Sequence, residues 1–462
     1  EALLTTVSAH PATALEVAAD YMDAGQWQDG TALLTLAAGA AHDKSKVSPL
    51  DYYYLGYFAG QMHQDAKARE YYELAAKAPT DYVFPFQMEM IAVLEDAMRV
   101  EPSDSRAPYY LGNLLYDWQP QQALALWEKS ASLGADFPVV YRNLAMVYLR
   151  LGDQRDTALA ALEKAVQFGG NADAINDLDK LYEEDGVPPA KRLALMEAHQ
   201  AVIDRDDAIA REINLEIFVG KPEAAIQLLR SRIFRAWEGG GSFSLGDSWI
   251  NANLASGSLH MIGKQYAQAL ADCQAALKIP VNLQGASGDV SGRKGEILYW
   301  MGNAYEAMGD AEKARRFWTD ASSAPGRDGA QVGESGPGTH GPPGGRASIG
   351  GLAAGVRVEQ AALYYQAMAL VKLGQADRAR TIFEQLVDAG AKALAKASNL
   401  ETPSQPYATA SERAQVADAH YLAGLGQLGL NNREKARQEF SLALKVSPDH
   451  DAAMRALKEM GP

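Results

Sequence analysis

The sequence has a single cysteine, Cys273, among its 462 residues. This excludes an internal disulfide and a zinc site built from several thiolates, so we expect packing alone to hold the fold. The longest clearly apolar, uncharged stretch, near Ala32 to Ala41, is about half of the roughly 20 residues that a membrane-spanning helix needs. Basic residues are also few: the chain has 43 basic and 58 acidic residues, which gives a net charge of -15. That charge repels phosphate backbones and anionic lipid, so neither nucleic acid nor membrane is expected as a partner.

Sequence signatures of catalysis and metal binding are also missing. The chain has no Walker loop, HExxH, GxSxG, CxxC or EF-hand loop. Asp173, Asp177 and Asp179 have the spacing of a calcium loop but lack its glycine, and we assign them to a solvated helix face. His199 is expected to be a surface or partly packed residue. No catalytic residue, metal site or cofactor is predicted, and the chain is expected not to be an enzyme, although the activity of a longer parent protein is left open.

The composition is that of a folded protein. It is 47% hydrophobic and 22% charged with a mean hydropathy of -0.23, which is too apolar for a chain that is disordered as a whole. Its length is about three times the roughly 150 residues of a typical domain, which indicates several domains or one elongated repeat structure. The chain begins at Glu1 without a methionine or a signal-like segment, so we interpret it as a fragment or trimmed chain and leave its compartment open.

An internal repeat runs through the chain. Its clearest copy reads YWMGNAYEAMGDAEKARRFWTDA. The key positions, at offsets 0, 3, 7, 12, 16 and 19, are Gly302, Tyr305, Gly309, Ala314, Trp318 and Ala321. The same offsets recur from Ala367 and from Ala18, and copies with small slips begin at Gly56, Gly112, Ala145, Gly257 and Gly424. Two weak copies centre on Asp179 and Ile213.

This pattern predicts a helical hairpin. Two antiparallel helices cross so closely that only small residues fit at offsets 0, 12 and 19, while the large residue at offset 16 fills the space between neighbouring hairpins. Glycine at offset 7 ends the first helix in a left-handed conformation. Cys273 stands at offset 16 and is therefore expected to be buried and unreactive. Because neither helix can bury its apolar stripe alone, successive hairpins are expected to stack into an all-α solenoid.

The pattern resembles the tetratricopeptide repeat, a unit of about 34 residues with small residues at conserved positions and often a closing proline. Positions 112, 145, 179 and 213 are separated by 33, 34 and 34 residues, and longer intervals elsewhere fit one repeat plus an insertion. Pro102 and Pro448 stand where closing prolines are expected. The resemblance implies a tetratricopeptide-type right-handed superhelix of antiparallel helix pairs.

The insertions suggest four segments. The division is 1–232 for an N-terminal run of repeats with an extra helix near 86–100, 233–321 for repeats with loop insertions, 322–355 for a Gly/Pro-rich linker or loop, and 356–462 for C-terminal repeats and a capping helix.

In this family the first helix of each hairpin lines the concave surface, so the resemblance implies a binding groove for a protein or peptide. The candidate groove residues are Arg106, Tyr109, Asn113, Tyr116, Asp117, Arg142, Arg150, Asn303 and Glu306. Arginine can clamp a carboxylate, asparagine can hydrogen-bond a peptide backbone, and tyrosine supplies rigid contact area. The alternative is a hydrated surface without a binding role. Tyr109 stands where the family's clamp for peptide C-termini has lysine, which argues against binding of chaperone tails.

A narrower resemblance suggests a second interpretation. Stretches such as FPFQMEMIAVLEDAM and SRIFRAWEGG look like the C-terminal repeat region of large bacterial proteins that carry an N-terminal β-rich domain, similar in type to sugar-handling β-sandwiches. That resemblance implies a β-rich domain of the same parent chain as partner, or a carbohydrate-associated module. Trp237 and Glu238, on a glycine-rich loop, could stack on and hydrogen-bond a sugar. Alternatively, Trp237 fills a gap between hairpins.

Overall fold

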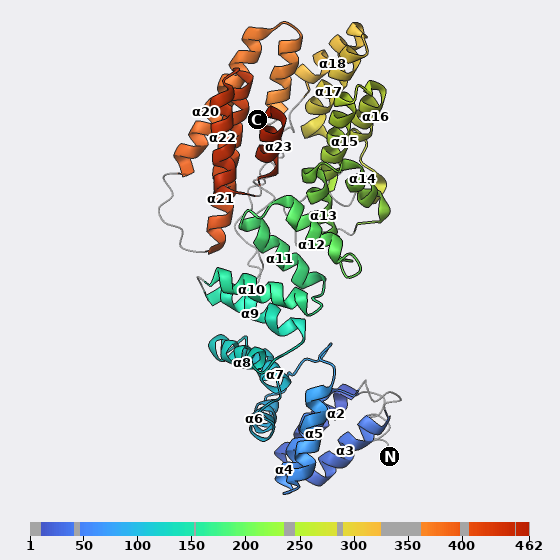
Figure 1. Cartoon of the computed structure of the whole chain (residues 1–462), viewed down its shortest axis with the longest axis vertical. Coiled ribbons are helices and arrows are strands. Elements are labelled where there is room, and N and C mark those ends of the chain that lie inside the picture. The colour runs from blue at the N-terminus through green and yellow to red at the C-terminus, as the bar shows by residue number, and fades with distance from the viewer. Residues whose placement is uncertain are drawn as a thin grey trace, which may run out of the picture. The chain divides into compact units, whose positions relative to one another are not determined.

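The fold is all-helical in the part of the chain that the computed structural model describes. The described residues are 11–40, 47–151, 154–234, 245–283, 290–324, 362–397, 406–448 and 450–461. No strand occurs within these ranges, so the predicted all-α fold is confirmed. The chain divides into two compact units, Glu1–Leu178 and Asp179–Pro462 (Figure 1). The four segments expected in the sequence follow the insertions between repeats and not the contacts within each unit, so that division stays a prediction.

The first unit consists of helix pairs. Its helices are α2 (Pro11–Asp23), α3 (Trp27–Ala40), α4 (Pro49–Gln61), α5 (Asp65–Lys77), α6 (Met90–Val100), α7 (Arg106–Leu115), α8 (Pro120–Ser132), α9 (Pro138–Leu151) and α10 (Arg155–Gln167). Short turns join α2 to α3, α4 to α5, α7 to α8 and α9 to α10, and the members of each pair pack together. Helix α6 lies within the range 86–100 where an extra helix was predicted; it begins at Met90 and packs on α4 and α7.

The second unit repeats this arrangement. Helix α11 (Ala172–Glu184) contains the boundary between the units. The helices that follow are α12 (Pro189–Ala198), α13 (Asp206–Val219), α14 (Pro222–Ser231), α15 (Leu245–Ile262), α16 (Tyr266–Ala276), α17 (Lys294–Ala307), α18 (Ala311–Ser322), α20 (Ala376–Ala397), α21 (Pro406–Gly429), α22 (Arg433–Val446) and α23 (Asp451–Met460). Residues 362–372 are also helical. Of the predicted linker 322–355, all but residues 322–324 lie outside the described residues.

Glycine at offset 0 is explained by the large residue of the second helix. In α17 and α18, a methyl group in place of the Gly302 hydrogen would lie 2.4 Å from the indole nitrogen of Trp318. Gly56 and Tyr72, Gly112 and Trp127, and Gly424 and Phe440 show the same close approach, at 2.4 to 2.5 Å. Real side-chain carbons do not come this close, so these four hairpins require glycine at the first position, whereas the hairpin with Phe383 accommodates Ala367 there.

The first helix of many hairpins ends in the left-handed conformation that the repeat pattern predicts. Gly25, Gly309 and Gly374 have φ of 66°, 81° and 75°. Three other hairpins place a residue with a side chain at the same offset and keep the same conformation: His63, Lys264 and Asn431, with φ of 60°, 58° and 62°. The turn geometry of the repeat therefore holds a left-handed conformation even at Lys264, whose side chain disfavours positive φ, while asparagine and histidine adopt it more readily.

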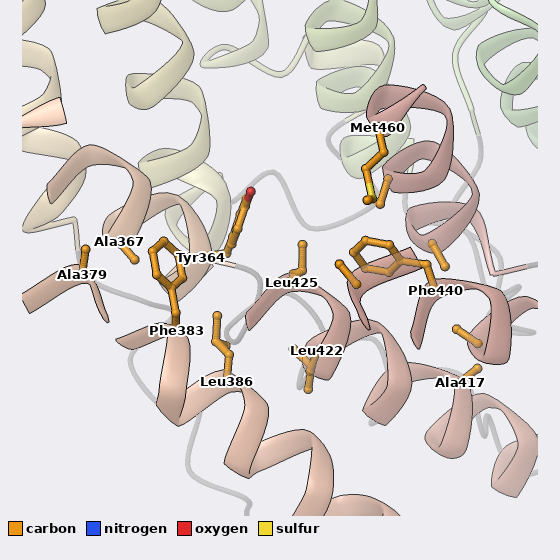
Figure 2. Close-up of a cluster of buried hydrophobic side chains, with 14 of the residues drawn as sticks. Tyr364, Ala367, Ala379, Phe383, Leu386, Ala417, Leu422, Leu425, Phe440 and Met460 are labelled. Carbon is orange, nitrogen blue, oxygen red and sulfur yellow. The ribbon is translucent and has the colours of Figure 1, made fainter. Parts of the chain in front are cut away.

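The side chains at offset 16 form much of the hydrophobic core. Figure 2 shows Phe383 beside Ala367 and Ala379, and Phe440 in the same apolar cluster of the second unit. Cys273 takes this offset in α16 and is only 4% exposed, so its predicted burial is confirmed. Burial raises the pKa of its thiol to about 12, which keeps the thiol protonated and disfavours reaction.

Candidate functional site

Helices α7 and α9, the first helices of two neighbouring hairpins, carry most of the predicted groove residues. They are joined directly, because the Asn143 amide nitrogen donates to the side-chain oxygen of Asn113 at 3.0 Å. We use the name α7–α9 surface for the polar and aromatic side chains on and just after these two helices. Its members are Asn113, Tyr116, Asp117, Arg142, Asn143 and Arg150.

Asn113 is the centre of a hydrogen-bond network on this surface. Its side-chain oxygen also accepts from the indole nitrogen of Trp127, at 3.1 Å. Asn113 thus links α7 to α8 and α9, so its first role is to hold the surface together.

Tyr109 was expected to face the groove, and that expectation is wrong, because its side chain is only 4% exposed. Its ring centroid lies 4.9 Å from that of Phe137 and 5.1 Å from that of Tyr110, in an aromatic cluster. Burial raises the pKa of its hydroxyl, and the nearby Asn113 side chain partly offsets this effect. Tyr109 is therefore a core residue whose ring packs on other aromatic side chains.

Arg106 is half-buried at the start of α7 and makes internal contacts. Its guanidinium donates to the backbone carbonyl of Ala76, just before the end of α5. It also lies over the ring of Phe137, 5.7 Å from the centroid. These contacts tie α5, α7 and the segment before α9 together, so substitution of Arg106 would disturb packing as well as charge.

Tyr116 and Arg150 are brought together by the structure. The Arg150 guanidinium lies over the Tyr116 ring, 5.3 Å from its centroid, and the other neighbour of this ring is Trp127, also at 5.3 Å. Arg150 is exposed, and so is Asp117, just beyond the end of α7. Stacking on an aromatic face restricts the position of the Arg150 guanidinium at the surface.

Arg142 lies on α9 and pairs with Asp177 of α11, with 2.8 Å between a guanidinium nitrogen and a carboxylate oxygen. The Arg142 side chain is 32% exposed. A pair at this exposure is only partly desolvated, so a carboxylate on a partner could compete for the same guanidinium.

Asn303 and Glu306 lie on α17 of the second unit, where Asn303 repeats the role of Asn113. Its side-chain oxygen accepts from the indole nitrogen of Trp318 at 3.1 Å. Glu306 is exposed and pairs with Lys372, whose ammonium is 2.5 Å from a Glu306 oxygen and lies over the Trp318 ring. Both residues therefore interact with Trp318: Asn303 accepts a hydrogen bond from its indole, and Glu306 pairs with the lysine that covers its ring.

Trp237 and Glu238 lie outside the described residues, so the sugar-binding loop and the packing alternative for Trp237 both stay predictions. His199 is partly buried, as expected, and one of its ring nitrogens lies 2.8 Å from the Leu195 carbonyl oxygen.

A buried ion network in the second unit was missed by the sequence reasoning. Asp179, which we had assigned to a solvated helix face, has a fully buried side chain and pairs with Arg192 at 2.8 Å and Arg211 at 2.5 Å. Glu183 completes the network, at 3.0 Å from Arg192 and 2.7 Å from Arg211. Burial alone would raise the pKa of Asp179, but the two arginines more than offset it and lower that pKa. No local motif reveals this network, because its partners lie 13 and 32 residues along the chain from Asp179.

The described part of the chain also bears on membrane and metal binding. None of the helices in that part of the chain is long and apolar enough to span a bilayer. Within the same residues, no three or more His, Cys, Asp or Glu side chains form a group that could hold a metal ion.

Comparison with known proteins identifies the repeat. The family model described as tetratricopeptide repeat matches residues 296–321 and 361–389. Among solved structures, the chain is similar to YrrB, described as a tetratricopeptide protein with an unusual peptide-binding site, at 16% identity, covering 49% of this chain and 90% of that one, with a TM-score of 0.22.

Two longer structural matches have similarly low scores. The tetratricopeptide domain of P58(IPK) is 12% identical over 94% of this chain and 97% of its own, with a TM-score of 0.23. The apo form of the quorum sensor NprR from B. thuringiensis is 13% identical over 95% of this chain and 99% of its own, with a TM-score of 0.26. Such low TM-scores carry no argument by themselves. The two segments matched by the family model coincide with the pair α17 and α18 and with the pair formed by residues 362–372 and α20, so these two hairpins are tetratricopeptide repeats.

Proposed function

We propose that the protein is a non-catalytic scaffold that binds a segment of another protein through the α7–α9 surface, on the concave side of its repeats. Tetratricopeptide repeats support a role in protein interaction in general. Arg142 and Arg150 are the residues of this surface that would contact the partner, whereas Asn113 would position them.

The observation that carries the proposal is the bond between Asn113 and Asn143. It fixes the first helices of two hairpins side by side, so that the side chains of both helices form one continuous surface. Arg142 and Arg150 are eight positions apart on α9, which is a rise of about 12 Å along the helix axis. An extended segment covers that distance with about four residues. The chemistry therefore favours an extended segment with two carboxylates at this spacing.

Peptide selection from a random display library, with the full chain as bait, would test this proposal. Peptides selected in this way should be enriched in paired acidic residues. The affinity of the strongest should fall by about tenfold or more when Arg142 and Arg150 are both changed to Ala, because a charged hydrogen bond at an interface contributes roughly 1.5 to 3 kcal/mol. Arg106 and Asn113 are less suitable for this test, because Arg106 binds the backbone carbonyl of Ala76 and Asn113 accepts hydrogen bonds from two neighbouring helices.

Lys392→Ala provides the matched control. Lys392 is a basic residue of α20 whose side chain is 77% exposed and pairs with Asp388. Its removal changes the net charge of the chain in the same direction without touching α7 or α9. If the selected peptides bound the wild type and the double arginine variant with equal affinity, the proposed site would be contradicted. If the control lost as much affinity as the double variant, the effect would come from net charge and not from this surface.

The carbohydrate-associated alternative and a β-rich domain as partner stay predictions. Neither is supported by an observation on the described residues.

A further inference from the structure

Helix α9 carries an apolar side chain between its two surface arginines. Met146 stands four positions after Arg142 and four before Arg150. At about 100° of rotation and 1.5 Å of rise for each residue, the three side chains follow one another on the same side of the helix, roughly 6 Å apart along its axis. Met146 is half-buried, and Leu149, almost one turn further on, is 39% exposed. The two arginines are thus connected by an apolar strip that consists of Met146 and Leu149.

The spacing of these side chains matches the period of an extended chain. Every second side chain of an extended segment points to the same face, so the first, third and fifth side chains face the helix at intervals of roughly 6.6 Å. Arg142, Met146 and Arg150 recur at about 6 Å along α9. An extended segment with carboxylates at its first and fifth positions therefore places its third side chain over Met146. This match is the same for either direction of the segment.

The orientation of the Asn143 amide provides an acceptor for the backbone of such a segment. The indole N–H of Trp127 can only donate, so the Asn113 atom that it meets is the side-chain oxygen. Asn143 bonds to the same oxygen and must therefore present its amide nitrogen there. The Asn143 oxygen lies on the other side of the amide and accepts no hydrogen bond from the described part of the chain. An extended segment has unpaired backbone N–H groups that can donate to this oxygen.

We propose that the segment recognised by the α7–α9 surface carries an acidic, an apolar and a second acidic side chain at alternate positions. This pattern rests on the proposed function, to which it adds the central residue of the partner. The carboxylates pair with Arg142 and Arg150. The apolar side chain packs on Met146 and Leu149, and a backbone N–H of the segment donates to the Asn143 oxygen. Met146 is then a specificity-determining residue, because its flexible thioether adapts to several apolar shapes.

The central position disfavours a third charge. A carboxylate over Met146 would lose water without gaining a cation, which is costly, and the net charge of -15 already repels an acidic segment. An apolar side chain at this position instead removes the exposed parts of Met146 and Leu149 from water, which is favourable. Salt screens the two ion pairs but not this contact, so the apolar residue should contribute the larger share of the affinity as ionic strength rises.

A focused peptide display library tests the central position. The library fixes two glutamates four positions apart, randomises the three residues between them and is selected on the full chain. The middle residue of the three should be enriched in Leu, Ile, Met and Phe, and its two neighbours should not, because their side chains point away from α9. In the strongest selected peptide, serine at the middle position should weaken binding to the wild type by about tenfold. Moving the apolar residue to either neighbouring position should weaken binding as much.

Met146→Gln tests the contact from the side of the protein. The serine peptide and its apolar parent should bind this variant with affinities within about twofold of each other, because the apolar contact is already lost. Met308→Gln is the matched control, since Met308 is 48% exposed at the end of α17 and lies in the second unit. It should keep the wild-type difference between the two peptides. Leu149→Gln, at a more exposed position of the strip, should also reduce this difference and serves as a second variant if Met146→Gln is unstable.

The pattern is overturned if the middle position shows no apolar preference although binding still requires Arg142 and Arg150, and the proposed function then stands without it. It is also overturned if serine at the middle position costs as much affinity in Met146→Gln and Leu149→Gln as in the wild type. Selection of no peptide, or of peptides that bind equally well without both arginines, would contradict the proposed function and the pattern together.

Discussion

The indole nitrogen of Trp127 donates to the side-chain oxygen of Asn113 at 3.1 Å. Asn113 directly follows Gly112, the residue on which the same indole packs. Trp318 makes the same bond with Asn303, the residue after Gly302, also at 3.1 Å. In these hairpins a tryptophan of the second helix, 15 or 16 residues after the glycine, therefore fills the space between the helices and also fixes an amide on the first helix.

This arrangement predicts energetic coupling between Trp318 and Asn303. Trp318→Phe and Asn303→Ala should each lower the free energy of unfolding by about 1 to 2 kcal/mol, and the double variant should lose less than their sum by roughly 0.5 to 1.5 kcal/mol, because the shared hydrogen bond is lost only once. Urea unfolding of the four proteins measures the coupling. Additive losses would show that the bond does not stabilise the fold.

The close approach of Trp318 predicts that Gly302 tolerates no side chain. Gly302→Ala should lower the free energy of unfolding by about 1 to 3 kcal/mol, because the new methyl group overlaps the indole. Gly39→Ala in α3 is the control, since a methyl group there would meet no atom of the described residues apart from its chain neighbours and its own helix backbone. That change should be neutral or stabilising by up to about 1 kcal/mol, as expected for alanine in a helix. Thermal unfolding of both variants would decide, and a destabilised Gly39→Ala would argue against the steric explanation.

The repeat made the hairpins predictable, because close packing of two helices imposes residue size at fixed offsets. The pairs Gly302 with Trp318 and Gly424 with Phe440 are visible in the sequence for this reason. The left-handed turns at His63 and Lys264 were less evident, because neither residue favours positive φ, and only the position of each in the repeat indicates its conformation. The start of α6 at Met90 also could not be derived, since residues 86–89 carry no clear capping signal.

The sequence predicts which helices carry the candidate site, but it does not predict whether each residue is exposed or buried. Arg150 and Asp117 are exposed, as a surface residue must be, whereas Tyr109 is buried because its ring packs on Phe137. Offset arithmetic identifies which helix carries a residue but not which neighbours cover it. The buried state of Asp179 likewise depends on arginines from two other helices, which a local pattern cannot reveal.

The residues with side chains at offset 7 offer a stabilising change. Lys264→Gly and His63→Gly should each raise the free energy of unfolding by up to about 1 kcal/mol. Glycine relieves a backbone strain of roughly 1 to 2 kcal/mol in the folded state. Part of this gain is cancelled because glycine also makes the unfolded chain more flexible. Asn431→Gly should gain less, since asparagine tolerates this conformation better. Melting temperatures of the three variants test the order. A gain at Asn431 as large as at Lys264 would contradict the explanation by strain.

The ion network around Asp179 predicts a loss of stability in acid. Asp179→Asn should lower the free energy of unfolding by about 3 to 5 kcal/mol near neutral pH, because Arg192 and Arg211 stay buried with less compensating charge. The pKa of Asp179 is lowered from its model-compound value of 3.8, so its contribution is present above pH 4 and is lost as the pH falls below that value. Asp207→Asn, which breaks the more exposed pair with Arg205, should cost under about 1 kcal/mol. A flat response of the wild type between pH 5 and pH 2, measured by chemical unfolding, would contradict this assignment.

Asp51 has the opposite dependence on pH. Its side chain is buried near the start of α4, and its Oδ1 atom has no hydrogen-bond partner among the described residues. Burial raises the pKa of this carboxyl from 3.8 to about 7, although a backbone hydrogen bond at Ser48 partly offsets the rise. The folded protein therefore keeps a proton that the unfolded chain has already released, and stability should fall as the pH rises from about 4 to about 7. At about 1.4 kcal/mol for each pH unit, this loss reaches about 4 kcal/mol.

Asp51→Asn should remove this dependence of stability on pH and be more stable than the wild type at pH 8. Asp65→Asn, at an exposed position on α5, should leave the dependence unchanged. Urea midpoints measured from pH 4 to pH 8 for the three proteins would test this, and an Asp51→Asn variant with the wild-type slope would show that the carboxyl is charged throughout.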